Sequence, residues 1–535
     1  MTGRGGGWPL TVFLDPEEQA PFFAGTYFPP EKRYGMPSFG EVLLAAKDWF
    51  QDNREEARNK GGQMAEALQS IQQPRGGDTP GPNEVQEIIQ QAAGQIYSRQ
   101  DTVNGGFGGA PKFPQAPLLE AVAFAGEIES GGSLHQALDF TLKQMALSGL
   151  RDHLDGGFFR YCVDDNWTIP HFEKMLYDNA MLLPLYAERA RHSGDSLLRS
   201  AAEGIVSWLD SAMRQAEGGY AASIDADADG EEGGFHVWRK AEVVEVLNDA
   251  QTTLFCATYG LNGPPNFEHN AWHLQRRRPM TGDSILSEEQ EGLLEAARHA
   301  LFAMREQRIH PTLDRKQLAS WNALLATGLI RAGQALQRDD WLQKADGILD
   351  FVSARLWDGE RLMAVYNSGE ARFAAYLDDY AWLLEALLLR LQSGWDPGRL
   401  EFAIRLADSL LASAEQAGTN RDWLEARRIG IDAKDLFVDQ GRSAFPADLE
   451  ILRTYYPAPV PYFAYLAPSS TMAFAPDRTH GLAADGRKAR LVDLKTMRLL
   501  DTYLEAPRDI AQIWYSPTGD TALLEHPDHA FTVWR

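Results

Sequence analysis

The chain has 535 residues, of which 44% are hydrophobic and 24% are charged, and its formal net charge is −24. This length exceeds what one hydrophobic core supports, and the composition is that of an ordinary globular protein, so we expect several folded domains. The excess of acidic side chains repels phosphate backbones and anionic lipid, which argues against nucleic acid or a membrane surface as partner. A small neutral ligand such as a sugar is compatible with this charge.

The chain contains two cysteines, Cys162 and Cys256, and no C-x-x-C pair. This spacing predicts neither a disulfide framework nor a redox or zinc site. No apolar stretch reaches the roughly 18 residues that cross a bilayer, and the first residues lack the apolar segment of a secretory signal. We therefore predict a cytoplasmic protein without a metal or other cofactor.

The first seventy residues have the pattern of a small α/β segment. Apolar runs predict strands over 10–14 and 22–27, and apolar residues at helical spacing predict a helix over 38–69. A stretch rich in glycine and proline, residues 72–82, then marks a linker. We assign residues 1–72 to one domain.

Residues 83–420 have a repetitive helical pattern. Amphipathic segments alternate with loops that carry two glycines and an aromatic residue, as in Gly156-Gly157-Phe158 and Gly218-Gly219-Tyr220. The predicted helices span 84–99, 115–128, 134–149, 171–192, 196–215, 286–306, 316–336, 340–355, 377–392 and 397–417. Helical hairpins joined in this way can stack into a closed ring. We therefore predict a multidomain, mainly α chain built around an α/α toroid, with an open helical solenoid as the alternative.

The final segment, residues 465–535, shows the alternation typical of strands. Two stretches of it resemble each other, and their equivalent prolines, Pro476 and Pro517, lie 41 residues apart. This period is typical of a WD40-type propeller blade. Two blades do not close a propeller, so the tail is either an incomplete propeller or a set of isolated β-hairpins.

Several long motifs follow one another along the first 390 residues. They are GGGWPLTVFL (5–14), GTYFPP (25–30), GGFGGAPKFP (105–114), RDHLDGGFFRYCVDD (151–165), WTIPHFEKMLYDN (167–179), SIDADADGEEGGFHVW (223–238), LDRKQLASWN (313–322) and YLDDY (376–380). In this order they resemble the family of spermatogenesis-associated protein 20 and its bacterial YyaL-type relatives. The resemblance implies a partial thioredoxin-like N-terminus and a toroid similar to the six-hairpin glycoside hydrolases and sugar epimerases, which is an expectation about fold rather than function.

The chain departs from this family in three places. The first half of the thioredoxin-like domain, with its cysteine motif, does not precede the Trp8-Pro9 step, so we expect no thiol-disulfide activity and a structural role for that step. Phe159 stands where family members usually have histidine. Beyond about residue 395 the family's closing hairpins give way to the propeller-like tail.

The strongest candidate site lies in the motif at 167–179. Pro170 predicts a helix start with Thr168 as its cap. On such a helix Glu173 and Tyr177 lie one turn apart, as do Lys174 and Asp178. So many acidic, basic and aromatic groups beside a glycine-rich loop predict the lining of a cavity. The alternative is an ordinary surface ion pair and a capping histidine.

Histidines of this region suit proton transfer. An epimerase removes a proton next to a carbonyl and returns one on the opposite face, and histidine titrates near neutral pH. We predict His171 and His153 as the catalytic pair, with two structural histidines as the alternative.

Three aspartates alternate in the motif at 223–238. Asp225, Asp227 and Asp229 match the first positions of a calcium loop, but His236 stands where that loop needs glutamate, so calcium is disfavoured. Asp225 or Asp227 can instead serve with Glu173 as the acid and base of a glycosidase, or bind sugar hydroxyls, or form a solvated loop.

Other residues are expected to bind substrate. Trp321, Asn322, Asp378 and Asp379 stand at or near predicted helix starts, where inner helices of a ring face its centre, although the two aspartates can simply compensate a helix dipole. The predicted substrate-binding residues are Arg160, Tyr161, Trp167, Lys174, Tyr177, Asp178, Trp321, Asn322, Asp378 and Asp379.

Three hypotheses about function follow. The first is a carbohydrate-active toroid, either a sugar epimerase or isomerase that uses the histidine pair. The second is a glycoside hydrolase that uses paired carboxylates. The third is a scaffold or sugar-binding protein without catalysis, whose unpaired β edges pair with a protein partner or a second copy.

Overall fold

The computed structural model of the chain describes residues 10–17, 20–33, 35–72, 82–128, 132–276 and 286–416, and seven strands between 471 and 534. The chain divides into two compact units, Met1–Val85 and Gln86–Arg535. Trp8-Pro9 and most of the predicted linker lie outside the described residues. The predicted domain bounds 1–72, 83–420 and 465–535 stay predictions.

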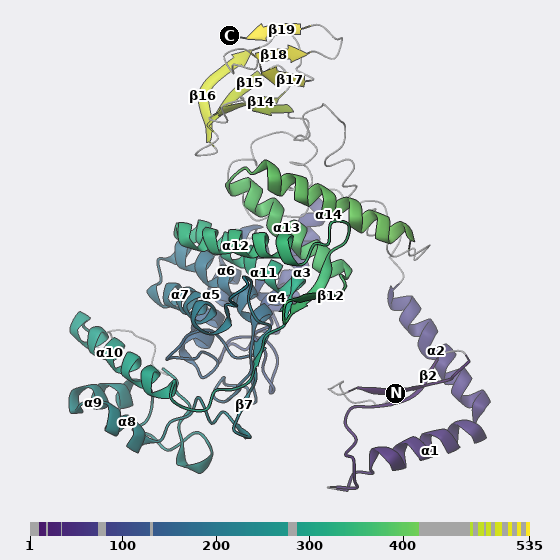
Figure 1. Ribbon diagram of the computed structural model, residues 1–535, viewed down its shortest axis with the longest axis vertical. Helices are drawn as coiled ribbons and strands as arrows, with labels where there is room; N and C mark the ends of the chain where they lie inside the picture. Colours follow the sequence, from purple (N-terminus) through teal and green to yellow (C-terminus); the bar gives the residue numbers. More distant parts are fainter. Residues whose placement is uncertain are drawn as a thin grey trace. The chain divides into compact units, whose positions relative to one another are not determined.

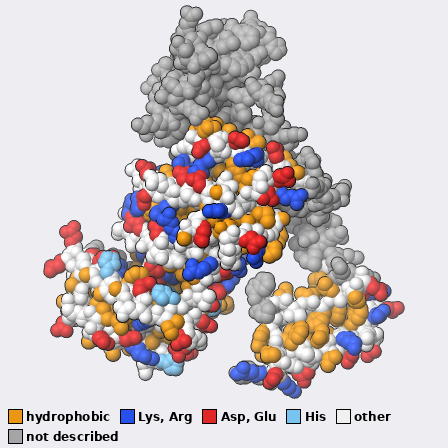
Figure 2. Space-filling model, viewed as in Figure 1, with side chains coloured by type: hydrophobic (Ala, Val, Ile, Leu, Met, Phe, Trp, Pro, Cys, Tyr) orange, Lys and Arg blue, Asp and Glu red, His pale blue; other side chains and the backbone are white. Residues whose placement is uncertain are grey.

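The N-terminal unit consists of a β-hairpin and two helices (Figure 1). Strands β1 (Thr11–Leu14) and β2 (Pro21–Gly25) pair antiparallel, and helices α1 (Phe39–Asp52) and α2 (Arg54–Gln72) follow. The single predicted helix over 38–69 is therefore wrong, because the chain breaks at Asn53, whose backbone leaves the helical region. Figure 2 shows apolar side chains gathered on this unit. Its exposed large apolar residues include Val12, Leu14, Leu43 and Leu44.

The larger unit is mainly helical, and its helices form successive hairpins (Figure 1). Among the described residues four hairpins follow the single helix α3 (Pro82–Tyr97). They are α4 (Ala116–Ile128) with α5 (Ser133–Leu147), α6 (Leu176–Ser193) with α7 (Ser196–Trp208), α11 (Ala319–Leu336) with α12 (Asp339–Arg355), and α13 (Leu377–Ser393) with α14 (Pro397–Gln416). Helix α6 packs on α4 and α11, and α11 packs on α13. The predicted class, a multidomain and mainly α chain with an α/α-toroid region, is confirmed.

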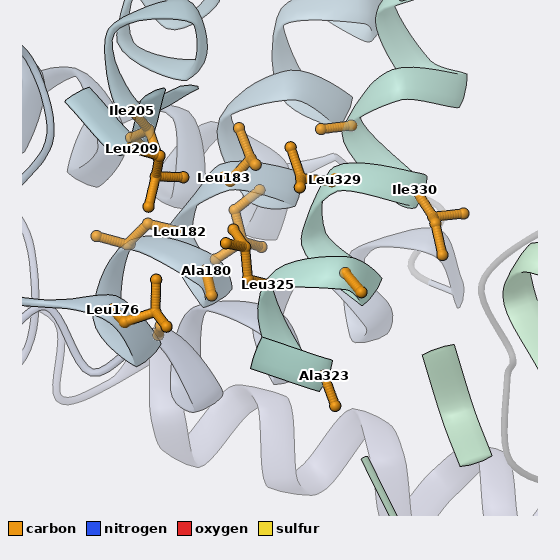
Figure 3. Close-up of a cluster of buried hydrophobic side chains, with 14 of the residues drawn as sticks. Leu176, Ala180, Leu182, Leu183, Ile205, Leu209, Ala323, Leu325, Leu329 and Ile330 are labelled. Atoms are coloured by element: carbon orange, nitrogen blue, oxygen red, sulfur yellow. The ribbon is translucent and has the colours of Figure 1, made fainter. Parts of the chain in front are cut away.

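The centre of the core lies where α6 meets α11. Leucine and alanine side chains of both helices pack together there (Figure 3). Ile205, on α7, and Leu209, directly after it, pack in the same cluster. Gly328 permits the close approach, since a Cβ at this position would lie 2.4 Å from the carbonyl oxygen of Ala180. Each fully buried leucine contributes roughly 1.5–3 kcal/mol through the hydrophobic effect.

Two of the glycine-aromatic loops are stabilised by the same pair of hydrogen bonds from a buried asparagine side chain. The amide of Asn179, in the first turn of α6, accepts a hydrogen bond from the N–H of Phe158 (2.8 Å) and donates one to the carbonyl of the same residue (2.9 Å). Asn322, in the first turn of α11, makes the same two bonds with Tyr220, at 2.8 and 3.0 Å. Both asparagines are completely buried. The loop needs glycine because Gly156 has a φ of 87° and a Cβ there would lie 2.2 Å from the carbonyl oxygen of Gly204.

A second hydrophobic cluster interrupts the hairpin order. Helices α8 (Lys240–Val246), α9 (Asp249–Thr258) and α10 (Glu288–Arg305) pack around Trp238, Phe255 and Leu294. The sequence predicted α10 but neither of the two shorter helices. No helix within the described residues is long and apolar enough to span a membrane.

The described strands near the C-terminus form two antiparallel sheets. One has the order β13 (Thr471–Phe474), β14 (His480–Asp485), β15 (Lys488–Asp493) and β16 (Arg498–Glu505), and the other β17 (Gln512–Tyr515), β18 (Ala522–Glu525) and β19 (Phe531–Trp534). The first strands of the two sheets, β13 and β17, lie next to each other. Neighbouring propeller blades meet in this way, so the arrangement favours an incomplete propeller over isolated hairpins.

Candidate functional site

Three helices begin beside one another and carry six of the fifteen predicted site residues. The ring of Tyr177, in the first turn of α6, meets the ring of Trp321, in the first turn of α11, at 4.8 Å between centroids. The carboxylate of Asp379, in the first turn of α13, accepts hydrogen bonds from the backbone N–H groups of Ser320 and Tyr376, both at 2.9 Å. Segments far apart in the sequence therefore meet at the N-terminal ends of α6, α11 and α13, which we call the helix-start face.

Short strands complete this face. Among them β3 (Tyr161–Cys162) pairs with β4 (Pro170–His171), and β5 (Lys174–Met175) pairs with β6 (Ser223–Ile224), which pairs with β9 (Leu313–Asp314). The predicted helix start at Pro170 is therefore wrong. Helix α6 begins at Leu176, and the Thr168 hydroxyl contacts Asn166 at 2.6 Å instead of capping it.

Lys174 begins strand β5 and Glu173 immediately precedes it, so neither residue lies on α6. The alternative interpretation, a surface ion pair between Lys174 and Asp178, is wrong for Lys174, which pairs with Asp152. Lys174 is buried and donates hydrogen bonds to the Asp152 carboxylate at 2.7 Å and to the Gly156 carbonyl at 2.9 Å. Its placement makes it part of the interior rather than a substrate-binding residue.

Asp178 has the environment of a protonated carboxyl group. Its Oδ2 atom is buried and has no hydrogen-bond partner within the described structure. Burial and the charge of Glu173 raise the pKa of Asp178, whereas Arg160 and Tyr177 lower it. The resulting pKa of Asp178 is about 7. Nearby, Arg160 Nη1 donates to Glu173 Oε2 at 2.9 Å. The site thus holds a carboxyl group, Asp178, whose pKa is raised to about 7, beside the ion pair of Glu173 and Arg160.

His171 lies between two carboxylates and against an aromatic stack. Its Nδ1 is 2.7 Å from Glu232 Oε1, and its Nε2 is 3.5 Å from Glu173 Oε2. Its ring stacks on Tyr161 at 5.1 Å, and Tyr161 in turn stacks on Phe113 at 4.5 Å. An imidazole held in this way is oriented for proton transfer.

Glu232 and Phe113 were missed by the sequence reasoning. Glu232 lies on β8 (Glu231–Glu232), which forms a hairpin with β7 (Asp227–Ala228) through a turn in which Asp229 and Gly230 both have positive φ. An Asp-Gly pair is typical of the two-residue turn of such a hairpin. This pattern in the sequence predicts that Glu232 lies opposite Asp227. Phe113 had no comparable signal.

Asp225 and Asp227 are exposed on this hairpin, and the Asp225 carboxylate accepts a hydrogen bond from the neighbouring Ala226 N–H at 2.7 Å. These contacts favour the solvated-loop interpretation. Their catalytic roles stay predictions. The described part of the chain contains no group of three or more His, Cys, Asp or Glu side chains arranged to hold a metal ion.

His153 lies apart from the groups just described. Its Nε2 is 2.8 Å from the Ser148 carbonyl oxygen and its ring contacts that of Tyr259. Burial and the charge of Arg151 lower the pKa of His153 to about 3. These contacts are those of a structural histidine, and its pairing with His171 stays a prediction.

Three other predicted residues have structural contacts. Trp167 is buried, with its indole N–H donating to the Asn104 carbonyl at 3.0 Å. Asn322 holds the loop at Tyr220, and Asp379 joins α11 to α13 as described above. Asp378 is exposed at the start of α13 and remains a candidate for binding substrate.

Behind the helix-start face lies a fully buried group of charges. Asp152 accepts hydrogen bonds from Lys174 and, at 3.0 Å, from Arg305 Nη1, and His236 Nδ1 is 3.6 Å from the same carboxylate. The two cations hold the pKa of Asp152 well below its usual range despite burial. We call Asp152, Lys174, Arg305 and His236 the buried charge cluster.

The comparisons with known proteins agree with this combination of parts. A protein-family model described as Thioredox_DsbH, a protein of unknown function (DUF255), matches residues 1–69. The chain therefore joins a thioredoxin-like N-terminal segment to a larger unit of helical hairpins.

Curated relatives identify its family. Spermatogenesis-associated protein 20 of Homo sapiens is 30% identical over 454 residues, which cover 76% of this chain and 57% of the relative. An uncharacterized protein of Caenorhabditis elegans is 31% identical over 422 residues, which cover 72% of this chain and 57% of the relative. The chain belongs to the family of spermatogenesis-associated protein 20. It spans a little over half the length of these relatives.

Solved structures with related helix arrangements include sugar-active proteins. An inactive variant of an alpha-1,6-mannanase from Salegentibacter sp. HEL1_6, in complex with alpha-1,6-mannotriose, is 11% identical with a TM-score of 0.32, covering 61% of this chain and 70% of that chain. A sugar epimerase from a ruminal bacterium is 14% identical with a TM-score of 0.29, covering 61% of this chain and 86% of that chain. TM-scores this low assign no function to this chain.

Proposed function

We propose that the helix-start face binds a carbohydrate and cleaves a glycosidic bond by acid and base catalysis, with Asp178 as the acid. The observation that carries the proposal is the buried, unbonded Oδ2 of Asp178 and its pKa of about 7, beside the Arg160–Glu173 ion pair. A carboxyl that keeps its proton near neutral pH is what protonation of a leaving oxygen requires.

The neighbouring groups supply the remaining parts of this chemistry. Asp178 donates its proton to the glycosidic oxygen as the bond to the anomeric carbon breaks. Glu173, as carboxylate, takes a proton from the water that attacks that carbon, and the proton returns to Asp178 through solvent. The rings of Tyr177 and Trp321 offer apolar faces to the C–H surface of a sugar, and Arg160 offers N–H donors to its hydroxyl groups.

A second candidate reaction is favoured by His171. Because this imidazole lies between Glu232 and Glu173, it is oriented to remove a proton beside a carbonyl, as an epimerase or isomerase requires. The products separate the two reactions, since hydrolysis shortens an oligosaccharide whereas epimerisation leaves its length unchanged.

The test is turnover of a saccharide panel by the full chain. We would incubate it with cello-, manno-, malto- and chito-tetraose and their monosaccharides and separate the products by anion-exchange chromatography. Asp178→Asn keeps the shape of the side chain but carries no acidic proton, so it should lower kcat by about 10²–10⁴-fold. The matched control is Asp350→Asn, which replaces an exposed aspartate of α12.

The pH profile gives an independent check. Because the acid must be protonated, kcat/KM should fall above pH 7, about tenfold per unit, and Asp178→Asn should remove this limb. Turnover that survives in Asp178→Asn, or a panel in which no saccharide is bound or converted, would contradict the proposal.

A further inference from the structure

Next to the helix-start face two aromatic side chains project into solvent. Phe373 is 68% exposed at the end of strand β12 (Glu370–Ala374), and Tyr376 is 70% exposed at the cap of α13. Most large apolar side chains of this region are buried, so two such rings only three positions apart are unusual.

The backbone at Phe373 is itself unusual. Its φ is +61°, which is uncommon for a residue with a bulky side chain and costs free energy. Burial in a core does not offset this cost, because the ring lies in water. Contacts among the described residues therefore do not explain why the backbone of Phe373 adopts this conformation.

Backbone contacts link both residues to the proposed site. One carboxylate, Asp379, binds the N–H of Tyr376 and the N–H of Ser320, and the residue after Ser320 is Trp321. Strand β12 belongs to a sheet with β11 (Met363–Asn367) and β10 (Gln317–Leu318), and β10 runs directly into α11. Tyr376 is thus linked to the start of the helix that carries Trp321, and Phe373 lies on a strand of the sheet that leads into this helix.

We propose that Phe373 and Tyr376 form an aromatic platform that stacks on a further sugar ring of an oligosaccharide whose reacting ring lies near Asp178. The inference rests on the proposed function and deepens it, since it makes the substrate an oligosaccharide rather than a monosaccharide. The C–H faces of a pyranose match exposed aromatic rings in shape and polarity. Glu370, Arg372 and Asp378, which are exposed and lie within three residues of Phe373 or Tyr376 in the sequence, suit the sugar's hydroxyl groups.

The test compares the binding of each tetrasaccharide with that of its monosaccharide, by calorimetry on the full chain with Asp178→Asn to prevent turnover. For at least one sugar type the tetrasaccharide should bind at least tenfold more tightly. The double variant Phe373→Asn/Tyr376→Ser should abolish that difference and leave the affinity for the monosaccharide unchanged. Asparagine tolerates positive φ, so this variant should fold. Tyr27→Ser, which removes an exposed tyrosine of the N-terminal unit, is the matched control.

The outcomes separate this inference from the function on which it rests. If a monosaccharide binds but its tetrasaccharide binds no more tightly, the platform is wrong and the proposed site stands. If the tetrasaccharide binds more tightly and the double variant keeps this advantage, the additional ring is bound elsewhere and the platform is again wrong. If no saccharide binds, both proposals fail.

Discussion

Glu173 and Lys174 are consecutive residues with opposite environments. Glu173 is half-buried, pairs with Arg160 and faces the groups of the candidate site. Lys174 is 2% exposed, pairs with Asp152 and belongs to the buried charge cluster. Glu173 precedes strand β5 and Lys174 is its first residue, and the two side chains contact different parts of the fold.

This difference shows how the fold supports a reactive surface. A buried ion pair is costly to desolvate and is strongly destabilising to break, so Lys174 fixes the position of its strand. Glu173 can then be held in a defined place although its own ion pair is partly exposed and weak. We therefore expect substitutions in the buried charge cluster to affect folding, and substitutions on the helix-start face to affect chemistry.

The largest expected effect is that of Lys174→Met. The variant leaves Asp152 with only one close cation in a buried position, and we expect the free energy of unfolding to fall by about 3–5 kcal/mol. Urea unfolding monitored by circular dichroism measures this change. Lys344→Met removes a lysine from a more exposed pair with Asp210 and should cost less than about 1 kcal/mol. Equal losses in the two variants would contradict the distinction.

The second-largest expected loss of stability is that caused by replacing Asn179 or Asn322. Asn179→Ala leaves the N–H and carbonyl of Phe158 buried without their partner, and Asn322→Ala does the same to Tyr220. We expect each to cost about 2–3 kcal/mol, because buried backbone groups lose their hydrogen bonds. Asn367→Ala, on strand β11, is the control. A loss at one position only would show that the two loops are not equivalent.

A third effect concerns pH. Burial and the nearby cations lower the pKa of His236 to about 3, from 6.5 in the unfolded chain, although Asp152 opposes the shift. Below pH 6.5 the unfolded state therefore binds a proton that the folded state excludes, so this histidine destabilises the fold increasingly as pH falls. His236→Gln should remove about 1.4 kcal/mol per pH unit from the slope of unfolding free energy against pH between 6.5 and 4.5.

The measurement is a series of urea titrations across that pH range, in which slopes rather than absolute stabilities are compared. The exposed His299→Gln is the control and should leave the slope unchanged. If His236→Gln has the slope of the unsubstituted chain, the histidine is not held neutral in the fold.

Much of the helical architecture could be predicted from the sequence. The ten predicted helices of the larger unit all occur, because their apolar positions recur at helical spacing over three or more turns. The two-residue strands could not be predicted, since so short a segment has no periodicity. The start of α6 was misplaced for this reason, as Pro170 fits a strand end as well as a helix start.

The candidate site was predicted in part. His171, Glu173, Tyr177, Asp178 and Trp321 do lie near one another, and their sequence motifs gave the signal. The inward direction of Lys174 followed from the strand and was therefore missed. The role of Asp178 as the group with a raised pKa depends on its burial and on Arg160, eighteen positions away, which no local pattern reports.

The smallest expected change in stability completes the comparison between the two neighbours. Glu173→Gln removes the charge from a half-exposed pair, so we expect the free energy of unfolding to change by less than about 1 kcal/mol. The same substitution should alter the chemistry, because the charge of Glu173 raises the pKa of Asp178. Turnover should fall because the proposed base is lost, and the pKa of Asp178 should decrease because Arg160 then acts on this carboxyl unopposed. Carbon-13 NMR of labelled aspartate, assigned with Asp178→Asn, follows this titration without substrate. A shift to higher pH, or a loss of stability as large as that of Lys174→Met, would show that Glu173 belongs to the supporting interior and not to the reactive surface.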